Sequence, residues 1–133
     1  MAESARGLLD TSVIIDLDRL DADRLPEGSA IAVITLAELA AGPHATQDEN
    51  ERALRQDRLQ WAATTWDPLP FDTDAARMYG RVFAAVRVAG RTARSRLADL
   101  LIASIAASND LPLYTRNPKD FAGLEHLVKV KTV

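Results

Sequence analysis

The sequence contains no cysteine, and this absence excludes two ways of stabilising or equipping a small protein. The chain can form neither a disulfide framework nor a thiolate zinc site. A cysteine-free chain suits a reducing compartment, and we expect the protein to be cytoplasmic. With 133 residues and 47% apolar content, the chain is predicted to form a single domain, residues 1–133, around its own core.

Long apolar runs are also absent from the sequence. No run reaches the roughly 18 residues that a membrane-spanning helix requires, so we expect no membrane association. Residues 1–6 lack the basic segment followed by an apolar segment that marks a signal peptide. These two absences indicate a soluble globular protein.

Acidic residues are missing from one internal stretch, residues 75–98, which contains six arginines. Residues 1–74 carry 15 acids against 6 bases, so the net charge of −3 hides a strong separation of charge along the chain. A local block of arginines can bind phosphate even in an acidic protein. The same block could instead form a solvated helix face or ion pairs with a partner, and the sequence leaves both readings open.

Apolar runs of strand length alternate with longer segments of helical periodicity. The predicted strands are residues 5–9, 30–34, 66–71, 111–115 and 127–130, and the predicted helices are residues 11–20, 35–41, 48–63, 72–89 and 95–108. Strands and helices that alternate in this way predict an α/β protein with a parallel sheet covered by helices on both faces. In such sheets, ligands bind beyond the carboxyl ends of the strands.

Three carboxylates occur in apolar surroundings, where acidic residues are uncommon. Asp10 directly follows the first predicted strand, and Glu38 and Asp99 each interrupt a long apolar stretch. An ionised acid in such surroundings must be paired, hydrogen-bonded or bound to a cation. Asp10 and Glu38 point to the same sheet edge if their strands are parallel neighbours. The helix face of Asp99 is otherwise apolar, so this side chain should face inward or into a cleft.

Oxygen ligands of this kind, without histidine or cysteine, suit Mg²⁺ or Mn²⁺. Such a metal can activate water and neutralise charge on a transferring phosphate, the two functions that phosphodiester hydrolysis needs. Taken alone, Asp10 could cap a helix and Glu38 could balance a helix dipole. Asp99 could bind Arg96 or a backbone amide. The three acids together are less easily explained separately, and we predict a shared metal site.

A fourth group of polar residues follows the strand predicted at residues 111–115 and therefore reaches the same sheet edge. Asn117 and Asp120 offer oxygen ligands. Thr115 adds a hydroxyl group and Arg116 adds positive charge. The pattern also fits an ordinary Asn-Pro turn, so these residues taken alone do not identify a site.

Four short motifs occur in the order typical of PIN-domain proteins, and the chain most closely resembles the VapC toxins of bacterial toxin–antitoxin pairs. The motifs are residues 8–15 (LLDTSVII), 35–39 (TLAEL), 98–103 (ADLLIA) and 115–121 (TRNPKDF). The resemblance extends from residue 8 to residue 130. It implies a PIN-like three-layer α/β/α sandwich with a central parallel sheet of about four or five strands.

The resemblance also implies a toxic endoribonuclease that depends on Mg²⁺, for which Mn²⁺ can substitute, and that cleaves RNA, often tRNA or ribosomal RNA. The implied catalytic residues are Asp10, Glu38, Asp99 and Asp120, of which the first three bind metal, and the implied supporting residues are Thr11, Ser12, Thr115 and Asn117. Many PIN domains have an acid two residues after the threonine, where this chain has Asn117. Either Asn117 or Asp120 would therefore fill the fourth position of the site.

Proteins of this group commonly dimerise and are neutralised by a cognate VapB-type antitoxin, whose peptide can place a basic side chain in the acidic pocket. The resemblance thus implies a homodimer or a toxin–antitoxin hetero-oligomer. A helical stripe suits either core packing or such a dimer surface, and it consists of Met78, Tyr79, Val82, Phe83 and Val86. The candidates for contacts with the RNA backbone are Arg91, Arg94, Arg96 and Arg116.

Three other functions fit parts of the same pattern. A phosphoacceptor signalling domain also binds Mg²⁺ on a parallel sheet, but it requires paired acids after the first strand, where this chain has Asp10 alone. A structure-specific DNA nuclease would have the same active site, and only substrate tests separate it from a ribonuclease. A non-catalytic PIN module would keep the fold for binding, and the presence of all three core acids argues against it.

Overall fold

The computed structural model describes residues 6–133, apart from the side chain of Ser95, and its centre is a four-stranded parallel sheet. The strands are β1 (Arg6–Leu9), β2 (Gly28–Ala30), β3 (Leu113–Thr115) and β4 (Val130–Thr132), in the spatial order β2-β1-β3-β4. All three neighbouring pairs are parallel, as predicted. Residue 5, where the first strand is predicted to begin, lies outside the described residues.

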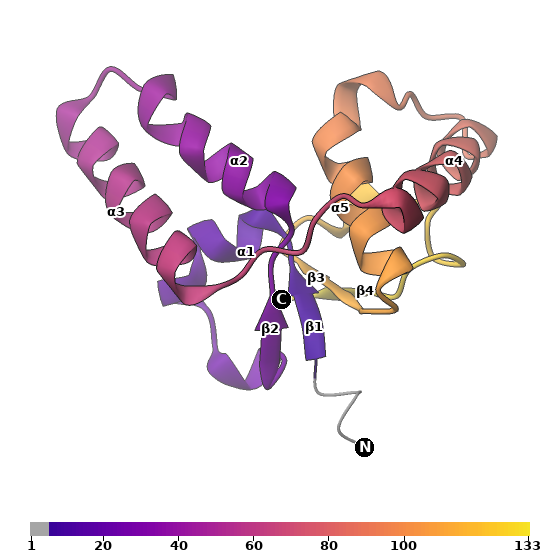
Figure 1. Ribbon diagram of the computed structural model, residues 1–133, viewed down its shortest axis with the longest axis horizontal. Coiled ribbons are helices and arrows are strands. Elements are labelled where there is room, and N and C mark those ends of the chain that lie inside the picture. The colour runs from indigo at the N-terminus through magenta and orange to yellow at the C-terminus, as the bar shows by residue number, and fades with distance from the viewer. Residues whose placement is uncertain (1–5) are drawn as a thin grey trace.

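Helices cover both faces of this sheet. They are α1 (Thr11–Ile15), α2 (Val33–Ala41), α3 (Glu49–Thr65), α4 (Thr73–Val88) and α5 (Leu97–Ser108). The helices α1, α2 and α3 lie on one side, and α4 and α5 lie on the other (Figure 1). The predicted three-layer α/β/α architecture is therefore confirmed. None of the helices in residues 6–133 is long and apolar enough to span a membrane.

The two central strands send alternate side chains to opposite faces of the sheet, and this alternation builds two cores. Leu8 of β1 and Leu113 of β3 are fully buried in the core that α4 and α5 cover. Their neighbours in sequence, Leu9 and Tyr114, are buried on the other face with residues of α1 and α3. Burial of a leucine side chain stabilises the fold by about 1.5–3 kcal/mol, so packing on both faces fixes the position of each strand.

The predicted strand 66–71 contributes only an isolated bridge to the sheet. The carbonyl of Leu69 accepts a hydrogen bond from Val33 N at 2.8 Å, and Leu69 N donates to Ile31 O at 2.9 Å. The residues on either side of Leu69 are prolines, which have no N–H group, so the ladder cannot continue. The sheet of the described residues therefore has four strands, within the predicted four or five.

Several predicted element boundaries are wrong, among them that of the last strand, which is predicted at residues 127–130 but is formed by Val130–Thr132. β2 ends at Ala30 and α2 begins at Val33, so the strand predicted at residues 30–34 is mostly a buried strand-to-helix junction. Ile31 is fully buried at this junction, whereas Val33 is 38% exposed at the start of α2, and periodicity does not distinguish this arrangement from a strand. The helix predicted at residues 11–20 is regular only as far as Ile15, and a short 3-10 helix takes up part of the remainder.

The strand order places a topological switch point between β1 and β3. The chain that leaves β1 returns as β2 on one side, whereas β3 pairs with β1 on the other side. Asp10 N donates to Tyr114 O at 2.9 Å, so the residue that follows β1 lies against the end of β3. Parallel sheets form their ligand sites at such a point, beyond the carboxyl ends of the strands.

Candidate active site at the carboxyl ends of the central strands

Asp10 is held in one orientation by two hydroxyl groups at the switch point. The residue is 4% exposed, and its Oδ2 accepts hydrogen bonds from Ser12 Oγ at 2.8 Å and Thr115 Oγ1 at 2.9 Å. These hydroxyls in turn accept backbone N–H groups, from Arg116 at 3.1 Å and from Asn117 at 3.0 Å. Each hydroxyl oxygen thus accepts one N–H group and directs its single proton to Asp10 Oδ2, so Asp10 accepts both hydrogen bonds. Its side chain makes no capping bond to α1, so the helix-cap explanation is wrong.

Glu38 is joined to the same sheet edge through Thr11. Thr11 Oγ1 donates to Glu38 Oε1 at 2.6 Å and lies 2.9 Å from Oγ1 of Thr35, a fully buried residue. The shorter distance is typical of a charge-assisted hydrogen bond. Glu38 lies beyond the first turn of α2, so its explanation as a helix-dipole residue is wrong. The sequence interpretation missed Thr35 as a site residue, although a hydroxyl inside an apolar run is the same kind of signal as Glu38.

Asp99 lies in the first turn of α5, and the charges of the other predicted acids act on it. Burial raises the pKa of Asp99 from 3.8 to about 7, and the charges of Asp10, Asp120 and Glu38 contribute in the same direction. The guanidinium of Arg96 opposes this shift in pKa without cancelling it. The other three carboxylates are therefore near enough to Asp99 for their charges to disfavour its ionised form. Residues from four separate segments thus form one acidic cluster.

The acidic cluster offers only carboxylate and hydroxyl oxygens, and this donor set fits a hard divalent cation such as Mg²⁺. As the side chains stand, no three acidic or histidine residues within residues 6–133 are arranged as a ready metal-binding group. Like charges at coulombic range repel one another, whereas ligands of Mg²⁺ must come within about 2.1 Å of the ion. Metal binding therefore requires these carboxylates to turn toward one another.

Arg96 forms its ion pair with Asp120. Arg96 Nη1 lies 2.7 Å from Asp120 Oδ1, and both side chains are about one-third exposed. The alternative in which Arg96 binds Asp99 is therefore wrong, and Arg96 acts on Asp99 through its charge alone. Asp120 belongs to the acidic cluster, whereas Asn117 is exposed at the start of a 3-10 helix (Pro118–Phe121). The assignment of the fourth site position to one of these two residues stays a prediction.

The remaining arginines predicted to bind RNA occupy two places. Arg116 Nη1 lies 3.9 Å from Asp16 Oδ2, at the edge of the acidic cluster. Arg91 Nη1 donates to Lys119 O at 2.9 Å, and Arg94 is exposed. Arg91 and Arg94 line a separate groove between α4 and the loop that leads to α5. The structure thus places positive charge both at the cluster and beside it.

The PIN domain family matches residues 7–127 of the chain. Ribonuclease VapC5 of Mycobacterium tuberculosis is 40% identical over 132 residues, which cover 97% of this chain and 95% of the relative. Ribonuclease VapC of Rickettsia bellii is 30% identical over 124 residues, which cover 90% of this chain and 91% of the relative.

A solved structure of a toxin-antitoxin system also resembles this chain. The crystal structure of VapBC-5, a toxin-antitoxin system of Mycobacterium tuberculosis, contains a chain that matches with a TM-score of 0.83 at 40% identity. The match covers 97% of this chain and 98% of that chain. The protein therefore belongs to the PIN-domain family and, within it, to the VapC group.

Proposed function

We propose that the protein is the toxin of a VapBC-type pair, an Mg²⁺-dependent endoribonuclease that hydrolyses phosphodiester bonds of tRNA or ribosomal RNA. The observation that carries the proposal is the acidic cluster. Burial and the charges of Asp10, Asp120 and Glu38 raise the pKa of Asp99 to about 7. A cluster with this excess of negative charge favours a divalent cation. The relatives named as ribonucleases support RNA as the substrate.

The cation would be held by three carboxylates, those of Asp10, Glu38 and Asp99. When bound, Mg²⁺ neutralises charge on the scissile phosphate and makes the attacking water more acidic. Ser12 and Thr115 orient Asp10, because both hydroxyl protons are directed to its Oδ2. Thr11 orients Glu38 in the same way through Oε1.

Asp120 is the carboxylate of the cluster that is not assigned to the cation, and we assign to it the acceptance of a proton from the attacking water. Arg96 Nη1 holds Asp120 Oδ1 at 2.7 Å, which fixes Asp120 near Asp99. The guanidinium of Arg96 would also offer positive charge to a phosphate bound at the cluster, where negative charge develops in the transition state. By family resemblance, hydrolysis leaves a 5′-phosphate and a 3′-hydroxyl.

The test is incubation of the purified, antitoxin-free protein with tRNA, ribosomal RNA and structured DNA, in Mg²⁺ or in EDTA. Discrete RNA fragments that require Mg²⁺, disappear with Asp99→Asn and persist with Asp110→Asn would support the proposal. Asp110 is the matched control because it is exposed just beyond the other end of α5, and asparagine readily adopts its φ of 55°. Cleavage of DNA alone would make the protein a DNA nuclease, and no cleavage of any substrate would favour a non-catalytic module.

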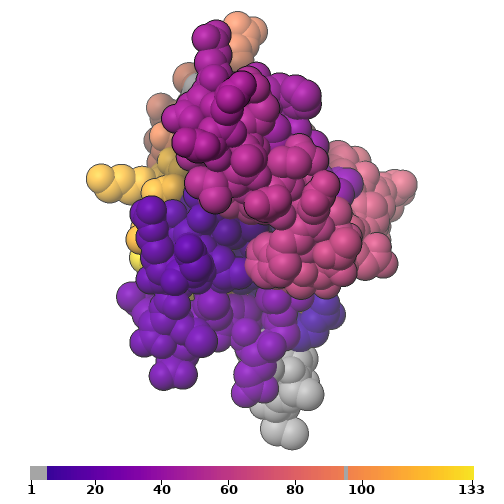
Figure 2. Space-filling view, turned by 90° about the vertical axis from the view of Figure 1, so that its left-hand side faces the viewer, coloured from indigo at the N-terminus to yellow at the C-terminus, as the bar shows by residue number. Residues whose placement is uncertain are grey.

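The surface between α1 and α3 is suited to the antitoxin's peptide. Two hollows of about 620 and 410 Å³ share Ile15, Asp18 and Arg58, and the larger one extends to Glu38. Leu54 is 59% exposed and Trp61 is 43% exposed on this face, which Figure 2 shows with α3 in magenta. Apolar side chains of a peptide would cover these residues, while a basic side chain would reach Glu38. Such a peptide would neutralise the acidic cluster directly.

A further inference from the structure

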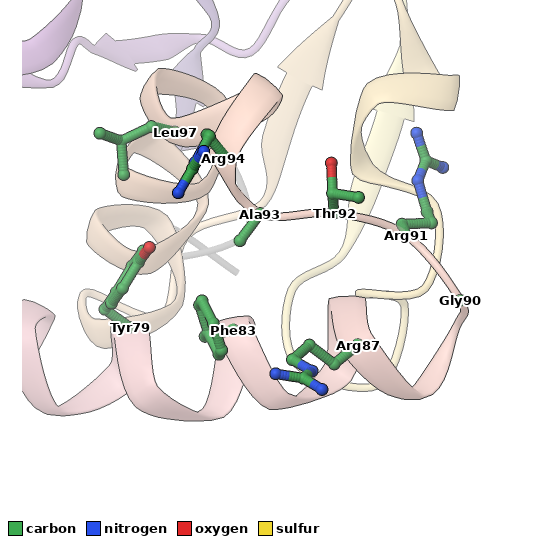
Figure 3. Close-up of a pocket in the computed structure, with 9 residues that line it drawn as sticks. All are labelled: Tyr79, Phe83, Arg87, Gly90, Arg91, Thr92, Ala93, Arg94 and Leu97. Atoms are coloured by element: carbon green, nitrogen blue, oxygen red, sulfur yellow. The ribbon is translucent and has the colours of Figure 1, made fainter.

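A groove beside α4 combines aromatic rings with arginines, and the acidic cluster does not use it. This α4 groove encloses about 640 Å³ between α4 and the loop that leads to α5 (Figure 3). Tyr79, Phe83 and Leu97 form its apolar surface. Arg87, Arg91 and Arg94 form its basic surface.

We propose that the α4 groove binds an unpaired nucleotide of the RNA substrate, with the base against Phe83 and the phosphates on the arginines. The inference rests on the proposed ribonuclease function and adds to it the form of RNA that the enzyme accepts, a single-stranded segment or loop. Ligand pockets in proteins range from about 300 to 1,000 Å³. The α4 groove falls within that range and is large enough for one nucleotide.

The aromatic residues leave a ring face available to a base. The ring centroids of Tyr79 and Phe83 are 6.1 Å apart and the ring planes are inclined by 52°, so neither ring covers the face of the other. Phe83 is 38% exposed, whereas Val82 and Val86 of the same helix are buried. The predicted apolar stripe is therefore partly core and partly surface. Unpaired bases stack on exposed aromatic side chains, because every base has an aromatic face.

The charge of the groove favours a nucleic acid over an apolar partner. Three arginines and no acidic residue are among its described lining residues, although the chain has a net charge of −3. Arg91 Nη1 is anchored on Lys119 O at 2.9 Å, which orients the guanidinium while its remaining donors stay free for a phosphate. Arginine beside an aromatic ring supplies both contacts that a nucleotide offers, one to phosphate and one to the base.

The α4 groove and the acidic cluster take residues from adjacent positions of one segment of the chain. Arg94 lines the groove and Arg96 binds the cluster, and both belong to one 3-10 helix (Arg94–Arg96). Leu97 then lines the groove from the first residue of α5, and Asp99 follows two residues later. An RNA bound along this segment would meet Arg94 at the groove and Arg96 at the cluster. The groove would select substrates in which the nucleotide near the cleaved bond is unpaired.

The test measures RNA binding in EDTA by the Asp99→Asn protein, which does not cut its ligand. The probe is a short single-stranded oligoribonucleotide with 2-aminopurine, whose fluorescence is quenched when the base stacks on a ring. Phe83→Leu keeps apolar surface but removes the ring, and we expect roughly tenfold weaker binding and loss of quenching. Phe83→Tyr should restore both. Arg77→Gln is the control on the same helix outside the groove, and it should change neither.

The single strand should also bind more tightly than a duplex of the same sequence, because paired bases do not present their faces. Equal affinity of Phe83→Leu and its parent for the single strand would overturn the proposal. A loss of binding that parallels dissociation of a dimer in sedimentation would also overturn it and would identify the groove as a contact between two copies of this chain. Failure of the proposed function is distinct, because it shows as absent Mg²⁺-dependent cleavage by the unmodified protein.

Discussion

Replacement of Asp99 by asparagine should stabilise the metal-free protein while it abolishes cleavage. Burial and the neighbouring carboxylates raise the pKa of Asp99 from 3.8 to about 7, so the folded protein binds this proton more tightly than the unfolded chain does. The contribution of this proton to the free energy of unfolding is fully present below about pH 4 and is lost as the pH rises through about 7. Asparagine has nearly the same shape and no charge, so the variant avoids that loss.

The magnitude follows from the shift in pKa of Asp99. A shift from 3.8 to about 7 would correspond to about 4 kcal/mol of unfolding free energy if it were fully expressed. Asp99 is only half-buried and solvent screens its neighbours, so we expect roughly 1–2 kcal/mol near pH 8. In EDTA, the melting temperature of Asp99→Asn should therefore exceed that of the unmodified protein by several degrees near pH 8. The difference should disappear toward about pH 4.

The assay is thermal and urea denaturation in EDTA across this pH range, with Asp110→Asn as the control for loss of a carboxylate outside the cluster. Equal or lower stability of Asp99→Asn near pH 8, or a difference that does not vary with pH, would refute the reasoning. Addition of Mg²⁺ should reverse the order of stability, because a ligand that binds the folded state stabilises it and only the unmodified protein has the complete acidic cluster.

Three further results are expected. Thr115→Val removes the hydroxyl that donates to Asp10 Oδ2 at 2.9 Å, so the initial rate of RNA cleavage should fall by roughly 10–100-fold. An unchanged rate would show that the orientation of Asp10 does not depend on this hydrogen bond. The affinity for Mg²⁺, measured by calorimetry, should rise between about pH 6 and about pH 8, because Asp99 must lose its proton to bind the ion. An affinity that does not vary with pH would exclude Asp99 as a ligand. Leu54→Glu should weaken binding of the antitoxin by roughly tenfold or more and leave RNA cleavage unchanged, and equal affinity would place the peptide on another surface.

The sequence predicts those parts of the fold that depend on burial and strand direction. β1 and β3 are apolar because both faces of the sheet are covered, and parallel strands bring Asp10 and Thr115 to one edge. The segment around Leu69 is different, since its single bridge between two prolines makes backbone hydrogen bonds without a strand. Apolar composition alone does not reveal that difference.

The side-chain partners within the site could not be predicted, because they join residues far apart in the chain. The bond of Thr11 to Glu38 spans 27 positions, and the bond of Arg96 to Asp120 spans 24 positions. The alternative pairing of Arg96 with Asp99 relied on regular helical spacing. Arg96 instead belongs to the 3-10 helix before α5, so that spacing does not apply and its guanidinium reaches a different loop.

The position of a bound metal tests the central claim most directly. Crystals of the protein prepared with Mn²⁺, which scatters X-rays anomalously, would locate the ion without reference to activity. We predict an anomalous peak in contact with carboxylate oxygens of Asp10, Glu38 and Asp99, and no such peak in crystals of Asp99→Asn. A peak elsewhere on the surface, or no peak at a Mn²⁺ concentration that supports cleavage, would contradict the acidic cluster as the catalytic centre.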